Sequence, residues 1–189
     1  MFSERDRNSY TLAARYMRAA AVMLFAPAFL LGATNSTTQM LSASVAANGK
    51  LSVPASLTLT TVGSTFVAYS GSLTVSYLVR TTASTGNGSI TMTASADFGP
   101  AGGPSISSGQ LTYLCSGANL GTACSGPLTV STSSQTNVVT IGAGVCTGGG
   151  APCSASNPNS VQTTFTLSNN PAYKTGTYSA TLTFTISAI

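Results

Sequence analysis

The chain has 189 residues, no histidine, and charged side chains at only 5% of its positions, with a formal net charge of +4. Globular domains usually carry about 25% charged residues, and Ser/His catalysis, paired carboxylates or calcium cages need groups that are scarce here. The composition therefore argues against an enzyme and, since no basic stripe is interleaved with aromatic residues, against a nucleic-acid-binding protein. We expect no cofactor and no metal site.

The first predicted element is an amino-terminal leader. Four arginines lie among the first 18 residues, and the apolar run Ala19 to Ala33 follows them. This pattern is typical of a signal peptide, whose helix is shorter than the roughly 20 residues of a membrane span. We expect residues 1–33 to be a signal peptide and the protein to be secreted or on the cell surface, with periplasmic transit in a Gram-negative bacterium. An uncleaved anchor is the alternative, and membrane contact is expected only through this segment.

From Thr34 onward, apolar and hydroxyl residues alternate with the period of two that marks half-buried β-strands. Strands are predicted at 41–47, 51–62, 72–79, 89–96, 110–114, 127–131, 137–141, 161–167 and 177–186. Turn signals containing Gly, Asn or Pro fall between them. Residues 34–189 are therefore predicted to form one all-β domain, an antiparallel, immunoglobulin-like two-sheet sandwich of about nine or ten strands after the signal helix. A closed barrel is the alternative architecture.

The first of these strands has two interpretations. Its alternate apolar residues, which make it a possible donor strand for another subunit, are Leu41, Ala43, Val45 and Ala47. Asn48-Gly49, however, is a favoured pair for two-residue hairpin turns, so the same segment can instead pair with the strand from Leu51 within one subunit. The turn signal favours the hairpin, and the donor strand stays open.

Four cysteines, an even number, are expected to form disulfides in an exported chain. They are Cys115, Cys124, Cys146 and Cys153. Of three possible connectivities we favour the sequential pairing, Cys115 with Cys124 and Cys146 with Cys153, because it closes two short loops. A four-cysteine zinc site is the rival, but the spacing lacks a Cys-x-x-Cys knuckle. The stretch 115–153 is predicted to be a disulfide-stapled loop region at an edge or end of the sandwich.

The last predicted strand is the most regular. One face, a possible terminal assembly strand, carries Tyr178, Ala180, Leu182, Phe184 and Ile186, and the other face carries only Ser and Thr. Edge strands of stable monomers usually carry Lys, Pro or inward charge, and this strand has none. It is expected to be either the final core strand or a strand whose edge is offered to a partner.

The closing GTYSATLTFTISAI, Gly176 to Ile189, follows an exported, Thr-rich and nearly uncharged β domain and resembles the ending of spore-coat-U-type and chaperone-usher pilin subunits. In that family each subunit is an incomplete immunoglobulin-like sandwich. A periplasmic chaperone holds the final-strand region until the amino-terminal extension of the next subunit fills the groove. The resemblance implies a structural subunit of a surface pilus, fibre or coat that assembles by β-strand addition with its own copies or other surface subunits.

A monomeric extracellular adhesion or carbohydrate-binding module is the alternative function. Such a sandwich would use exposed aromatic and amide side chains at one end, for which Tyr69, Tyr113, Tyr173 and Asn170 are available. The two functions differ in size-exclusion behaviour, because a binding module runs as a monomer whereas a strand-exchange subunit associates or needs a chaperone.

Overall fold

The structure is a computed structural model, and it describes residues 39–44, 46–61, 63, 65–81, 86–143, 145 and 158–189. The predicted signal peptide, Val45, Cys146 and Cys153 lie outside these residues. The chain divides into two units, Met1–Ala43 and Ser44–Ile189. In the first unit, the described residues 39–43 form no regular secondary structure and their side chains are exposed.

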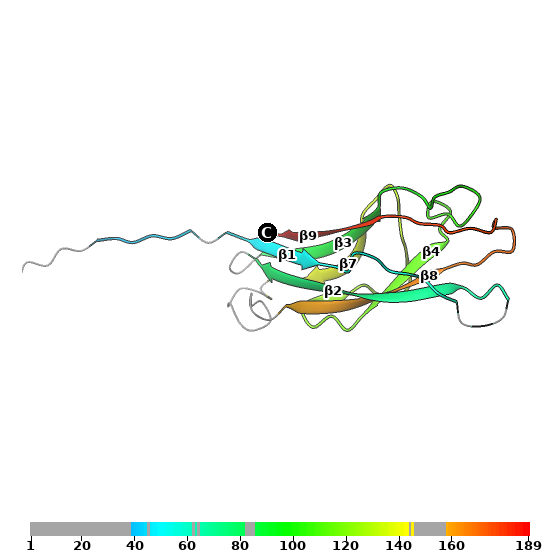
Figure 1. The fold of residues 1–189 in the computed structure, drawn as a ribbon. Helices are drawn as coiled ribbons and strands as arrows, with labels where there is room; N and C mark the ends of the chain where they lie inside the picture. The colour runs from blue at the N-terminus through cyan, green and yellow to red at the C-terminus, as the bar shows by residue number, and fades with distance from the viewer. Residues whose placement is uncertain are drawn as a thin grey trace, which may run out of the picture. The chain divides into compact units, whose positions relative to one another are not determined.

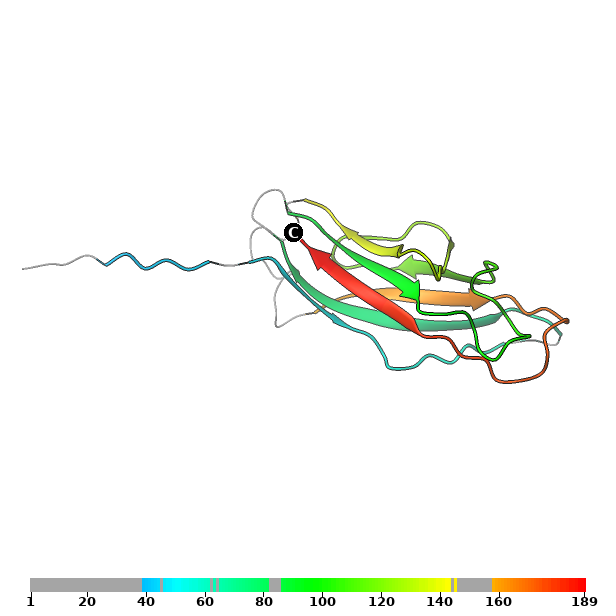
Figure 2. The ribbon, with the colours of Figure 1, turned by 90° about the horizontal axis from the view of Figure 1, so that it is seen from above.

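The second unit consists of β-strands, with no helix among its described residues. The strands are β1 (Asn48–Ser52), β2 (Tyr69–Arg80), β3 (Gly88–Ala94), β4 (Leu111–Ser116), β5 (Thr122–Ala123), β6 (Leu128–Thr129), β7 (Thr136–Ile141), β8 (Asn159–Leu167) and β9 (Leu182–Ala188). They form two antiparallel sheets with the orders β1-β2-β8-β4-β6 and β5-β7-β3-β9 (Figures 1 and 2). The predicted all-β, two-sheet sandwich is confirmed.

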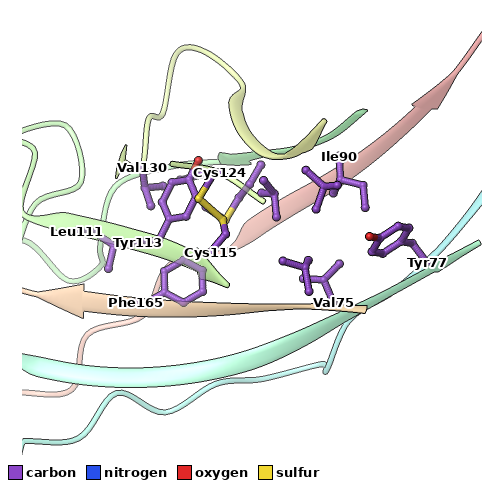
Figure 3. Close-up of a cluster of buried hydrophobic side chains, with 14 of the residues drawn as sticks. Val75, Tyr77, Ile90, Leu111, Tyr113, Cys115, Cys124, Val130 and Phe165 are labelled. Carbon is purple, nitrogen blue, oxygen red and sulfur yellow. A yellow bond between two sulfur atoms is a disulfide. The ribbon is translucent and has the colours of Figure 1, made fainter. Parts of the chain in front are cut away.

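The core lies between the two sheets and follows directly from the period-two pattern. Val75 on β2, Ile90 on β3 and Phe165 on β8 are almost completely buried, and Figure 3 shows them in the same cluster as Tyr113 of β4. Fully burying such a side chain contributes about 1.5 to 3 kcal/mol. The alternation that predicted the strands therefore also selects the residues that hold the sheets together.

One of the two predicted disulfides is described, and it joins the two sheets. Cys115 is on β4 in the five-stranded sheet, and Cys124 directly follows β5 in the four-stranded sheet. The predicted pairing of Cys115 with Cys124 is confirmed, whereas Cys146 and Cys153 lie outside the described residues. The stretch 115–153 includes β5 and β6, which are edge strands of the two sheets, and β7.

The predicted hairpin at Asn48-Gly49 is wrong. Both residues lie within β1, which pairs with β2 in a register that runs from Asn48 opposite Arg80 to Ser52 opposite Ser76. Gly49 lies close to β9: a Cβ atom at this position would lie 3.1 Å from the Ile186 side chain, so a larger residue would crowd it. The glycine lets the edges of the two sheets meet, and the sequence pair imitates a turn signal.

Candidate functional site: a groove beside the last strand

A groove of about 1030 Å³, lined by apolar side chains together with Ser, Thr and Asn, opens into the core between the edges of the two sheets. One wall is the chain after β1, residues 53–59, and the other is residues 177–182 with Phe184. The floor is formed by side chains from β2, β4 and β8, namely Leu73, Leu111, Phe165 and Leu167. The groove therefore exposes part of the space that a complete sandwich would fill.

The groove is closed at one end and open at the other. Near the carboxyl terminus β1 lies beside β9, where Gly49 meets Ile186 (Figures 1 and 2). We call this the closed end. Beyond Ser52 the pairing with β2 stops, because Pro54 lacks the backbone N–H that a ladder needs, and the chain rejoins β2 only at the Thr60–Ser70 bridge.

The missing pairing across residues 53–59 was not predicted from the sequence, where 51–62 is expected to be one strand. Leu57 and Leu59 still pack against the core. Gly71 of β2 lets this segment come close, because a Cβ there would lie 2.9 Å from the Leu59 side chain. The signal that could have revealed the interruption is Pro54 within an otherwise alternating pattern.

The outer edge of β9 is unpaired by any strand in the described part of the chain. Ser95 N–H donates to the Thr181 carbonyl at 3.0 Å, and Ile189 N–H donates to the Asn87 carbonyl at 2.9 Å. In an antiparallel ladder successive residues direct their backbone groups to opposite sides. The odd-numbered residues between 181 and 189 therefore face β3, and the even-numbered residues direct N–H and C=O to the open edge.

These even-numbered residues are also the apolar ones predicted to form the terminal assembly strand. Leu182, Phe184 and Ile186 lie on β9, where they are half-buried and pack against the core. Thr183 and Thr185 alternate with them and are exposed. Each inward-facing residue of β9 thus offers an apolar side chain to the interior and hydrogen-bonding backbone groups to the open edge.

The other two predicted members of that strand, Tyr178 and Ala180, precede β9 and line the groove. The Tyr178 ring packs on Gly103, where even a Cβ atom would lie 2.2 Å from it, and its hydroxyl donates to the Lys174 carbonyl at 2.7 Å. The strand prediction from Thr177 is therefore too long at its start. Tyr178 instead fixes the 168–181 connection to the neighbouring loop.

The open end of the groove, which we call the mouth, is lined by Phe66, Asn169, Asn170 and Tyr173. The Tyr173 hydroxyl is buried without a hydrogen-bond partner among the described residues, and burial raises the pKa of Tyr173. Three residues proposed for a binding module, Tyr69, Tyr173 and Asn170, do line this groove.

The fourth residue of that set does not belong to the groove. Tyr113 is 1% exposed in the core, and its hydroxyl donates to the Asn137 carbonyl at 2.6 Å. The same alternation that selects groove residues in the sequence also selects such core residues, so the sequence could not separate the two groups.

Asp97 organises the loop that carries Phe98 into the groove. Its carboxylate accepts hydrogen bonds from the hydroxyls of Ser107 and Ser105, at 2.6 and 2.7 Å, and from the backbone N–H groups of Ile106 and Phe98. Burial acts to raise the pKa of Asp97, but the hydrogen bonds outweigh it and hold the pKa well below its usual range. The carboxylate is therefore a structural anchor for residues 97–107.

The predicted donor segment has exposed apolar side chains. Leu41 is 94% exposed and Ala43 is also exposed, whereas Val45 lies outside the described residues. Ala47 is partly buried, and the preceding Ala46 carbonyl accepts a hydrogen bond from Arg80 Nε at 2.8 Å. Residues 46 and 47 thus belong to the sandwich, and the segment available to another molecule ends before Ala46.

Among the described residues, no three His, Cys, Asp or Glu side chains come close enough to hold a metal ion, and no helix there is long and apolar enough to cross a membrane. The sequence matches no model of a known protein family and no curated protein.

Proposed function

We propose that this chain is an exported structural subunit that polymerises by β-strand addition, with a segment of one copy filling the groove of another. The observation that carries this proposal is the coincidence of a groove that has an apolar floor with the edge of β9 that no described strand pairs. A strand added to that edge would form main-chain hydrogen bonds for affinity and place alternate side chains in the groove for specificity. Burying the groove lining would supply the hydrophobic free energy.

The proposed occupant is the segment Thr34 to Val45 of a second copy. It is uncharged, and among the described residues that line the groove only Lys174 carries a charge. Leu41, Ala43 and Val45 alternate, and a strand paired with β9 would direct these three inward. Met40 and Leu41 are both nearly fully exposed in the structure, and large exposed apolar side chains fit a segment that becomes buried in a partner.

The connection to the following domain sets the direction of the added strand. Residue 46 already belongs to the donor's own sandwich, so the carboxyl end of the added segment must lie where a folded domain has room. The closed end is blocked by β1 of the acceptor. The segment therefore runs with its carboxyl end at the mouth, antiparallel to β9.

The contact is heterologous, because one copy uses its groove and the other uses its amino-terminal segment. Repeated heterologous contacts that do not close into a ring give filaments. A surface pilus, fibre or coat is the assembly that the leader and the resemblance to pilin-type subunits support. A periplasmic chaperone that covers the open edge before assembly, and other surface subunits, are partners consistent with this function.

The test is to export residues 34–189 into an oxidising compartment and to examine the purified material by negative-stain microscopy and size-exclusion chromatography. Multimers are expected, and deletion of Thr34 to Val45 should give monomers that bind a synthetic peptide of this segment. Leu41→Asp should prevent multimers because its side chain would face the groove, whereas Ser42→Asp, facing away, is the matched control. If the undeleted domain is monomeric and does not bind the peptide, the proposal is contradicted. This holds also when the domain's own segment fills its groove.

A monomeric adhesion or carbohydrate-binding module is the second candidate, because Tyr69, Tyr173 and Asn170 converge on the groove. Aromatic rings and amides are suitable for stacking on sugars and hydrogen bonding to them. This function predicts a monomer whose thermal stability rises with an oligosaccharide and not with the peptide. If thermal stability rises with the peptide but with no member of a glycan panel, the binding-module function is rejected.

A further inference from the structure

Two exposed apolar surfaces lie at opposite ends of the sandwich. Phe66 and Val67 are 54% and 43% exposed at the mouth, and Ile189 is 68% exposed beside the closed end. We infer that these ends meet in the assembled fibre, where Phe66 of one copy packs against Ile189 of the copy that donates its strand. This inference depends on the proposed function and adds a second contact between the same two copies.

The mouth surface is held in place. Asn169 Nδ2 donates to the Val67 carbonyl at 3.1 Å and so ties this turn to the connection after β8. Phe66 has a φ of 55°, a left-handed conformation that is uncommon for a bulky residue. Such conformations persist only when the surrounding structure imposes them. The backbone of this turn is therefore fixed at the mouth.

The other surface is equally fixed. Ile189 N–H donates to the Asn87 carbonyl at 2.9 Å, which continues the β3–β9 ladder to the last residue. β1 begins at the same end, since Gly49 contacts Ile186. The mouth lies at the opposite end of β2, a strand of 12 residues, so the two surfaces are separated by about 35 to 40 Å within one copy. One copy therefore cannot join its own two surfaces.

The short connection in the proposed fibre brings these two ends together between copies. Val45 is the last inward-facing residue of the donor segment, and β1 of the donor begins at Asn48. Three residue steps reach about 10 Å. The end of the donor sandwich that carries Ile189 must therefore lie at the mouth of the acceptor, against Phe66 and Val67.

The charged side chains near the two ends, Lys174 and Arg80, make other contacts within the subunit and so leave the Phe66–Ile189 contact free. Lys174 lies along Gly102, where a Cβ would be 2.9 Å from its Cδ atom, and Arg80 is bonded to Ala46. Leu114 provides a matched reference surface, because it is 45% exposed but lies within β4. An apolar side chain of similar exposure away from both ends should take no part in the contact.

The experiment uses cysteine cross-linking in multimers of the exported chain. A disulfide forms only when two Cα atoms come within about 7 Å, so the Phe66→Cys and Ile189→Cys double variant should give a ladder of cross-linked copies on a non-reducing gel. The matched Leu114→Cys and Ile189→Cys double variant should give about tenfold less cross-linking. Binding of a labelled peptide of residues 34–45 is measured in parallel on each variant lacking its own segment.

A second variant keeps the inference falsifiable if cysteine disturbs the turn. Ile189→Ser removes the apolar side chain at the other end, keeps the backbone N–H that is bonded to Asn87, and lies outside the groove lining. The subunit should therefore fold and bind the peptide within about twofold of the unsubstituted protein, both lacking residues 34–45, while multimers of the full variant dissociate about fivefold faster, equivalent to about 1 kcal/mol. Peptide binding without a Phe66–Ile189 cross-link, or with unchanged dissociation of Ile189→Ser multimers, overturns the inference and leaves strand addition standing. Absence of peptide binding by the otherwise unsubstituted protein that lacks residues 34–45 overturns both.

Discussion

At the scale of single residues, Asp97 is the side chain whose chemistry is best defined. It is the one acidic side chain between Thr34 and Ile189, and it accepts four hydrogen bonds within its own loop. Because the loop carries Phe98 into the groove, the carboxylate supports the site by holding this loop in place. A lone acidic side chain, in a domain whose other charged side chains are Lys50, Arg80 and Lys174, also makes its titration easy to isolate.

The stability of the sandwich should depend on pH through Asp97. Its pKa in the folded protein is lower than the unfolded value of about 3.9. The stabilisation is therefore complete above about pH 5, where both states are ionised, and is lost progressively as the pH falls below about 4 toward the folded-state pKa. Thermal unfolding measured between pH 7 and pH 2 should show this decline.

Asp97→Asn provides the matched control for the acid decline. The amide keeps one acceptor oxygen but cannot accept all four hydrogen bonds, so the variant should be less stable at pH 7 and nearly insensitive to acid. An equal decline in the variant and the unsubstituted protein would contradict the assignment of the pH dependence to Asp97.

At this scale the sequence separated some roles and not others. The pairing of Cys115 with Cys124 followed from loop length, and the structure confirms it. Asn48-Gly49 gave a wrong turn prediction because a glycine that makes room for Ile186 produces the same residue pair as a hairpin turn. Phe66 could not be identified from the sequence, since neither its left-handed backbone nor its exposure has a local signature.

At the scale of strands and links, β9 is central because its apolar face and its open edge coincide. Phe184→Ala should weaken binding of the peptide of residues 34–45 by at least about tenfold, or 1.4 kcal/mol, because the ring lines the groove. Thr185→Ala is the control, since its side chain is exposed on the outer face. Calorimetric titration of the two variants, each lacking its own amino-terminal segment, measures the difference; equal affinities would show that the peptide does not use the groove.

The Cys115–Cys124 disulfide makes a separate prediction about the link between the sheets. Replacing both cysteines by alanine should lower the free energy of unfolding by about 2 to 3 kcal/mol, because the closed loop no longer restricts the unfolded chain. Urea unfolding measures this change. A pair variant with an unchanged midpoint and slope would mean that the bridge does not stabilise the sandwich.

Strand positions were predictable where one face is buried and the pattern is uninterrupted, as in β2, β3 and β8. The limits of β1 and β9 were not, since the sequence alternates through Val62 in one case and from Thr177 in the other. Alternation records which side chains face the interior, and extended segments beside a groove alternate in the same way as paired strands. Strand pairing also requires a neighbouring strand with suitable backbone groups. Pro54 interrupts the pairing after β1 because it has no backbone N–H, and the outer edge of β9 has no neighbouring strand among the described residues.

At the scale of the whole molecule, the fold class followed from composition and period, whereas the groove did not. A sandwich with a complete edge and one with an open edge have the same alternation and the same turn signals. The difference lies in where two segments distant in sequence, 53–59 and 177–184, fail to meet. In the proposed assembly by strand addition this gap would be the binding site, and the low charge of the chain would be favourable because copies would not repel one another.

The most direct test of strand addition is amide hydrogen exchange of β9 measured residue by residue by NMR, with and without a peptide of residues 34–45. The amides of Leu182, Phe184 and Ile186 point to the open edge and should exchange readily in the free subunit lacking its own segment. On peptide addition, those of Leu182 and Phe184 beside the groove should become strongly protected, while Thr183 and Thr185, already bonded to β3, change little. Peptide binding that leaves the Leu182 and Phe184 amides exchanging as before would contradict strand addition at this edge.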